Sequence, residues 1–90
     1  MHVKINTAAL NAAEVPITNN AAALVRMSFN PSDIPQVDRI KALAAALISE
    51  CEALREDKPV AAREASIAIT DIQSASMFAV AAATAHLGQS

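Results

Sequence analysis

The chain has 90 residues, with 7 Lys and Arg residues against 9 Asp and Glu residues and a formal net charge of -2 at pH 7. DNA- and RNA-binding domains usually carry a basic surface, so this balance argues against a nucleic-acid polymer as the partner. A small anionic ligand is not excluded, because a few well-placed cations are enough to bind one.

The composition provides little material for a thick hydrophobic core. Hydrophobic residues make up 53% of the chain, but much of this is alanine, and Trp and Tyr are absent. Alanine contributes little burial energy, although it allows helices to approach one another closely. A chain of this size buries only about 60% of its unfolded surface as a monomer. We therefore expect several copies to assemble.

The single cysteine, Cys51, cannot form an intramolecular disulfide or a zinc site by itself. It falls on an apolar helix face, which predicts a reduced core residue. The N-terminal sequence has no apolar run long enough for a signal peptide. These features predict a cytosolic location.

Residues 1–24 show no sustained hydrophobic period, and Pro16 and the pair Asn19 and Asn20 interrupt them. We expect an N-terminal arm whose order depends on its partners. A short helical turn is predicted at 8–14 or at 20–26, and neither would be stable in isolation.

A first long helix is predicted at about 33–57. Asn30 can cap it, with Pro31 in the first position and Asp33 in a capping box; alternatively Asp33 is itself the cap. Lys58 and Pro59 end the helix. Its apolar residues recur at spacings of three and four, at Val37, Ile40, Ala44, Leu47, Cys51 and Leu54.

A second long helix is predicted at about 60–87, ending near Gly88, the only glycine. Its apolar residues occupy several faces, so the first helix and further chains must cover it. Arg63, Glu64 and Asp71 leave an uncharged stretch that we judge too short for a membrane span, and no membrane partner is expected.

The connection between the two helices is so short that they must be antiparallel neighbours. The predicted fold is all-α: an arm or short helix at 1–29, followed by an antiparallel helical hairpin domain at 30–90 that assembles into a compact homo-oligomer.

Catalysis has little support in the sequence. His2 and His86 lie at opposite ends of the chain, and no catalytic triad or glycine-rich phosphate loop can be argued. We therefore expect no enzyme activity, no cofactor and no metal. A cluster of carboxylates is interpreted as a solvated helix face rather than a cation site; it comprises Glu50, Glu52, Glu56 and Asp57.

The cations are more informative. Lys41 lies beside the apolar seam, so we expect its stem to be packed and its ammonium to emerge at the edge of the hairpin; an ordinary surface lysine is the alternative. Arg26 and Phe29 precede the first helix and could close over a ligand held by Lys41 by stacking on a base. Packing of Phe29 on the first helix is the alternative for that residue.

Arg63 falls on a face of the second helix that points away from the hairpin seam. This position predicts a contact between chains or a pocket at a symmetry axis. A salt bridge to a neighbouring carboxylate is the alternative.

Two segments together resemble a known family. The sequence I-K-A-L at 40–43, combined with R-x-A-x-I-A-x-T-D-I-Q from Arg63 and with Met77, is similar to the helical-hairpin domain of phage anti-CBASS proteins. The resemblance covers about the last two thirds of the chain. It implies a homohexamer that sequesters cyclic dinucleotides such as cyclic GMP-AMP, without cleaving them, in the cytoplasm of the infected bacterial host.

The resemblance also implies roles for particular residues. Lys41 corresponds to a lysine that contacts the ligand phosphate. A base-stacking tyrosine of the relatives would fall at or next to Arg26, and this chain has no tyrosine. Either stacking passes to Arg26 or Phe29, or the range of ligands differs. Relatives can carry a second pocket, for cyclic trinucleotides, whose arginine corresponds to Arg63; Leu43 departs from the hydroxyl-bearing residue of that pocket.

The leading hypothesis is thus a sponge for cyclic nucleotides. A small helical assembly or adaptor protein without a small ligand is the alternative. A weak hydrolase that uses the acidic cluster ranks third.

Overall fold

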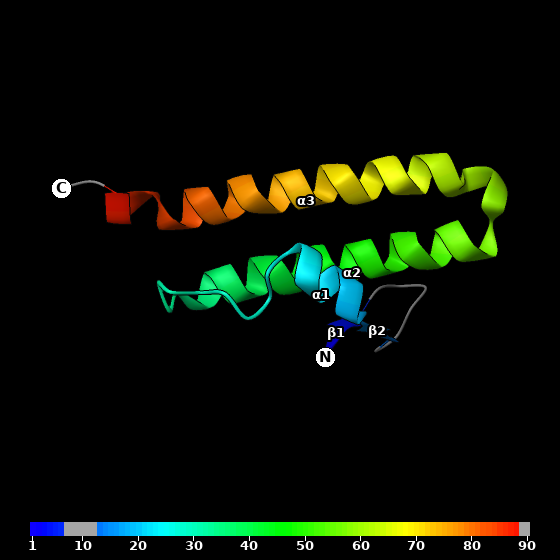
Figure 1. Cartoon of the computed structure of the whole chain (residues 1–90). Coiled ribbons are helices and arrows are strands. Elements are labelled where there is room, and N and C mark those ends of the chain that lie inside the picture. The colour runs from blue at the N-terminus through cyan, green and yellow to red at the C-terminus, as the bar shows by residue number, and fades with distance from the viewer. Residues whose placement is uncertain (7–12, 89–90) are drawn as a thin grey trace.

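Two long antiparallel helices dominate the computed structural model, which describes residues 1–6 and 13–88 (Figure 1). Helix α2 spans Pro35–Asp57 and helix α3 spans Ala62–Thr84, with a 3-10 turn at Pro59–Ala61 between them. A second 3-10 turn, Ala85–Gly88, follows α3. Ahead of the hairpin lie strands β1 (His2–Ile5) and β2 (Ala13–Pro16) and the short helix α1 (Asn19–Leu24).

The helical hairpin confirms the main part of the predicted fold, and its helices begin and end close to the expected positions. The start of α2 differs in detail. Pro35 occupies the first turn and Ile34 is the N-cap, without a side-chain cap. The Asn30 amide nitrogen instead donates to the Ile34 carbonyl at 3.0 Å, and Asp33 adopts a left-handed conformation with φ of 56°. Both predicted caps are therefore wrong.

The N-terminal segment corrects the all-α prediction. Strands β1 and β2 pair antiparallel, with Val3 opposite Val15 and Lys4 opposite Glu14. The strands are only four residues long, so their period-two alternation is too brief to stand out in the sequence. Of the two alternative helical turns, the one at 20–26 is confirmed by α1. The one at 8–14 is wrong at Ala13 and Glu14, which lie in β2, and its remainder falls outside the described residues.

The core lies where α1, α2 and α3 meet, and Cys51 is buried there as a free thiol, as predicted. The buried face of α2 is shifted from the predicted seam, and the seam residue Leu54 is 44% exposed. Ala45 and Ile48 are fully buried, whereas Leu47 is 53% exposed. The prediction considered only α3 as the partner of α2. Because α1 also packs on α2, the buried face of α2 lies in a different position around the helix. The buried core cluster contains Ala21, Val25, Ala45, Ile48, Cys51 and Ile69.

Large apolar side chains of α3 remain exposed on several faces, including Ile67, Met77 and Phe78. By length and composition alone, the segment Pro59–Leu87 is also long and apolar enough to cross a membrane. The prediction that this stretch is too short for a membrane span is therefore wrong. The expected absence of a membrane partner stays a prediction.

Candidate ligand-binding site

The C-terminus of α1 places a cation in an unusual backbone conformation. The Arg26 amide donates to the Ala23 carbonyl at 3.1 Å and the Met27 amide donates to the Ala22 carbonyl at 2.9 Å. This pair of bonds is a Schellman motif, whose left-handed position is normally glycine. Arg26 occupies it here with φ of 54°, at a cost of roughly 1 kcal/mol, and its side chain is exposed.

Lys41 is only 6% exposed, and it ties the following loop to α2. Its ammonium donates to the Arg26 carbonyl at 2.9 Å and to the Phe29 carbonyl, and lies 5.5 Å from the centroid of the Phe29 ring. The packed stem agrees with the prediction, but the ammonium does not emerge at the hairpin edge. A buried ammonium needs acceptors, and the two loop carbonyls supply them.

The far end of this loop, which we call the 26–34 loop, is fixed by Asn30. Its amide nitrogen donates to the Ile34 carbonyl and to the Asp38 carboxylate at 3.1 Å, while its oxygen accepts from the Ser32 hydroxyl at 2.7 Å. Lys41 at one end and Asn30 at the other therefore determine the course of the loop. Phe29, between them, is 60% exposed, which does not support its packing on the first helix.

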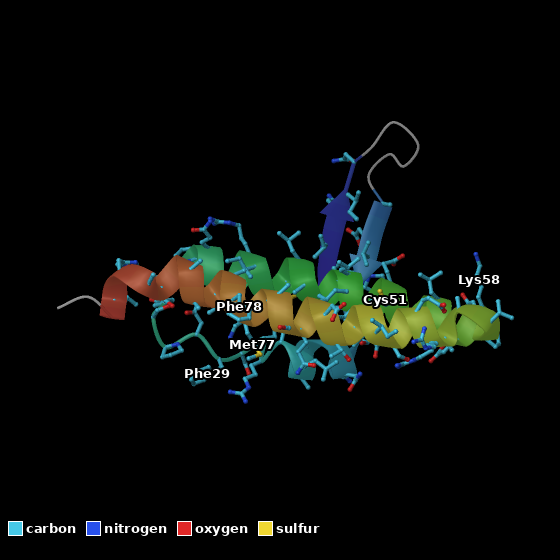
Figure 2. The ribbon with its side chains drawn as sticks, turned by 90° about the horizontal axis from the view of Figure 1, so that it is seen from above. Phe29, Cys51, Lys58, Met77 and Phe78 are labelled. Carbon is cyan, nitrogen blue, oxygen red and sulfur yellow. The ribbon has the colours of Figure 1, made fainter. Side chains whose placement is uncertain are left out.

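Three hollows border the 26–34 loop in the part of the chain that the structure describes. One, of about 660 Å³, lies between the loop, α1 and Met1, and the other two are both lined by Lys41, Phe29 and Val80. The first of these two, of about 560 Å³, extends toward the end of α3; its other lining residues are Asn30, Pro31, Ser32, Val37, Thr84 and Leu87. The second, of about 260 Å³, includes Arg26 and α3 residues; the rest of its lining is Leu24, Val25, Gln73, Ser76 and Met77. Figure 2 shows Phe29, Met77 and Phe78 at this same end of the hairpin. The hollow of about 560 Å³ has the size of ordinary small-molecule sites.

The structure thus brings together Lys41, Arg26 and Phe29, and it leaves Arg63 apart from them. Arg63 is exposed in the first turn of α3, while Val80 and Thr84 of the hollow lie in its last turns. Leu43 is 61% exposed and lines a separate groove beside β1. The ligand-binding roles of all these residues stay predictions.

The sequence pointed to Met77 only through the resemblance and gave no sign that Val80 lines both hollows beside Lys41. The position of these α3 residues depends on the register of the hairpin, which no local pattern reveals. Sequence reasoning also missed the role of Glu52, which accepts hydrogen bonds from the Thr18 hydroxyl and, at 2.8 Å, from the Asn20 amide. Within residues 1–6 and 13–88, no cluster of three His, Cys, Asp or Glu side chains is placed to hold a metal ion.

The architecture defines a class of protein: a helical hairpin in which a lysine of one helix holds a loop beside a ligand-sized hollow. Residues 19–84 match the family model described as Acb2/Tad1, hairpin domain. The match runs from α1 through α3 and covers more than half of the chain. This chain therefore belongs to the Acb2/Tad1 family of anti-CBASS sponges, as the sequence resemblance predicted.

Domains of this family bind cyclic oligonucleotide signals and are not enzymes. The match begins at residue 19, so it includes α1 and leaves β1 and β2 outside. Neither a curated protein nor a solved structure gives a significant match to the chain.

Proposed function

We propose that this protein is a non-enzymatic sponge that binds cyclic dinucleotides such as cyclic GMP-AMP in the cytoplasm of an infected bacterium. By holding the signal, a phage protein of this kind would block CBASS defence. The observation that carries the proposal is the grouping of Lys41, Arg26 and Phe29 around hollows between the 26–34 loop and α3.

The chemistry of these groups suits a ligand with two phosphates and two bases. The Arg26 guanidinium is exposed and can bind a phosphate through two parallel hydrogen bonds or stack on a base. Lys41 uses its ammonium for two loop carbonyls and keeps one further N–H for a phosphate oxygen. The exposed ring of Phe29 offers a flat apolar surface for base stacking.

A homohexamer is part of the proposal. The exposed apolar residues of α3 support it, because a soluble chain of this size gains stability by covering them with further copies. Light scattering at micromolar concentration tests the assembly, and a stable monomer would contradict it.

A second pocket, for cyclic trinucleotides, is proposed around Arg63. Its support is the separation of Arg63 from the 26–34 loop along α3. Clustered arginines at a symmetry axis would repel one another, and phosphate groups would relieve this repulsion. Leu43 does not fit this pocket, because the relatives with such a pocket carry a hydroxyl-bearing residue at that position.

One observation favours the adaptor alternative. The ammonium of Lys41 already has two protein acceptors, so a purely structural lysine that fastens the 26–34 loop accounts for its burial. In that case the chain would assemble without taking up a nucleotide.

A release experiment separates the alternatives. The protein is mixed with cyclic GMP-AMP, freed of unbound ligand and heated, and the supernatant is analysed by chromatography. A sponge returns the nucleotide intact, a hydrolase returns breakdown products, and an adaptor takes up nothing. The first outcome is expected.

A matched pair of variants assigns the uptake to the site. Arg26→Ala removes an exposed cation beside the smaller hollow, and Arg39→Ala removes an exposed cation elsewhere on α2. Arg26→Ala should weaken binding about 10- to 100-fold by calorimetry, because it removes charge-assisted hydrogen bonds. Arg39→Ala should leave the affinity nearly unchanged. Equal effects of the two substitutions on the affinity would show that Arg26 is not part of the binding site.

A further inference from the structure

Strand β1 has an outer edge whose backbone N–H and C=O groups point away from β2. The Ile17 amide donates to the Met1 carbonyl at 3.0 Å, while Pro16, opposite His2, has no N–H to donate. Bonded and non-bonded pairs alternate along an antiparallel ladder, so Val3–Val15 is a bonded pair and His2–Pro16 is not. The backbone N–H and C=O groups of His2 and Lys4 consequently point away from β2.

The two edges of the sheet differ in their capacity to bind another strand. The outward groups of β2 belong to Glu14 and Pro16, and the missing N–H of Pro16 weakens that edge. The outward edge of β1 offers a donor and an acceptor at both His2 and Lys4. Within residues 1–6 and 13–88 the sheet has two strands, and no strand pairs with the outer edge of β1. A two-stranded sheet is marginally stable, and an unpaired edge with donors and acceptors in place is a template for a further strand.

An apolar groove continues from this edge over α2. It has a volume of about 390 Å³ and is lined by Val3 and Ile5 of β1 and by Leu43 and Leu47 of α2. Both leucines are more than half exposed, at 61% and 53%. Figure 2 shows the strands projecting from the helical layer, beside α2. A strand added to β1 would place alternate apolar side chains on the face that already carries Val3 and Val15.

We propose that the occupant is β1 of a second copy, paired antiparallel around a two-fold axis at Val3 to give a four-stranded sheet in the order β2, β1, β1, β2. The β1 strand is self-complementary in this register. His2 lies opposite Lys4 of the partner subunit, so the outward groups of both strands pair with one another. Met1, Val3 and Ile5 of both copies then share the apolar face.

Charge selects this register over its neighbours. A two-fold axis at Lys4 would place two ammonium groups directly opposite each other, which destabilises a strand pair. An axis at His2 would leave Lys4 outside the pairing of the two β1 strands. The contact does not involve Lys41, and only Met1 among its residues borders a hollow beside the 26–34 loop. The pairing of His2 and Lys4 is therefore tested separately from the proposed nucleotide binding.

Disulfide trapping tests the pairing. Two Val3 residues would form a directly opposed, non-bonded pair with Cα atoms about 4.5 Å apart, within the range of a disulfide. Val3→Cys in a Cys51→Ala background should form a covalent dimer under mild oxidation on a non-reducing gel. Glu14→Cys in the same background, which carries its thiol on β2, should not. Failure of Val3→Cys to cross-link, or preferential cross-linking through Lys4→Cys, overturns the proposed pairing.

A second pair of variants does not rely on an introduced thiol. Lys4→Pro removes an outward N–H without removing a bond to β2, whereas Lys4→Ala removes the same charge and keeps the N–H. The two-fold axis means that one hydrogen bond is lost from each copy, so Lys4→Pro should weaken the association of the two copies about 10- to 100-fold in sedimentation experiments. Lys4→Ala should assemble as the parent does. Circular dichroism verifies that both variants keep their helices, and equal assembly of the two variants contradicts the pairing.

Discussion

Helix α2 is contacted by two regions of the chain through different chemistry. Toward α3 the contact is largely apolar, and Ile48 of α2 shares a buried cluster with Ile69 of α3. Toward the N-terminal segment, Ala21 and Val25 join the same apolar cluster, and the contact also includes several directed hydrogen bonds. The Thr18 amide donates to the Ser49 hydroxyl at 3.1 Å, Glu52 accepts from Thr18 and Asn20, and Lys41 holds the 26–34 loop.

The two contacts contribute differently to stability and to the positions of the elements. Apolar burial is non-directional and scales with area, so the α2–α3 contact supplies stability without fixing fine geometry. Hydrogen bonds require particular distances and angles, so the polar contacts fix the positions of α1 and of the loop that carries Arg26 and Phe29. Substitutions in the two contacts should therefore affect different measurements.

The largest expected effect on stability comes from the apolar contact. Ile48→Ala leaves a cavity at a fully buried position and should lower the free energy of unfolding by about 2 to 5 kcal/mol, measured by urea denaturation at fixed protein concentration. Leu54→Ala, at a 44% exposed position of the same helix, is the control and should cost less than about 1 kcal/mol. Equal losses would show that Ile48 does not anchor the hairpin.

Lys41→Met should affect both stability and ligand binding. The substitution keeps an apolar stem but leaves the carbonyls of Arg26 and Phe29 without their donor, at a cost of about 1 to 3 kcal/mol. Affinity for cyclic GMP-AMP should fall about 10- to 100-fold by calorimetry. Lys58→Met, which removes an exposed ammonium beyond α2, is the control. An unchanged affinity in a folded Lys41→Met protein would make Lys41 a structural residue only.

Glu52→Gln should loosen α1 with a smaller loss of stability. The amide can no longer accept from both Thr18 and Asn20, and the loss of one bond to a charged group costs about 1.5 kcal/mol. Hydrogen exchange at the amides of α1 should accelerate, while exchange in the centre of α3 stays constant. Glu56→Gln, at an exposed position one turn later, should change neither.

The smallest effect is expected at Arg63. Because Arg63 is exposed and remote from the 26–34 loop, Arg63→Ala should change stability by less than about 0.5 kcal/mol and leave cyclic dinucleotide binding nearly constant. Binding of a cyclic trinucleotide should be lost. A loss of dinucleotide affinity as large as that of Lys41→Met would mean that there is one pocket rather than two.

The hairpin was predictable because its signals are long and local. The spacing of Val37 and Cys51 within the seam, and the pair Lys58 and Pro59, sufficed to define two antiparallel helices. The sheet was not predictable, since four-residue strands carry too little alternation, and their pairing joins residues on both sides of 7–12.

The candidate site was predictable in composition but not in geometry. Lys41, Arg26 and Phe29 do lie together, yet the sequence placed the Lys41 ammonium at the surface. Its burial depends on the carbonyls of Arg26 and Phe29, and Arg26 starts this loop in a left-handed conformation. A sequence with arginine at that position gives no sign of such a turn, since glycine is the usual occupant.

The tight turn between α2 and α3 has a consequence for the order of folding. Contacts beside Pro59–Ala61 close short loops, so contacts between α2 and α3 can form first at this turn and then progressively toward the open end of the hairpin. The Thr18–Glu52 bond closes a separation of 34 residues, and the strands and α1 are synthesised before the surface of α2 that receives them. The 26–34 loop lies at the open end, where the contacts between α2 and α3 form last. In refolding experiments, recovery of nucleotide binding should therefore lag behind recovery of helical circular dichroism.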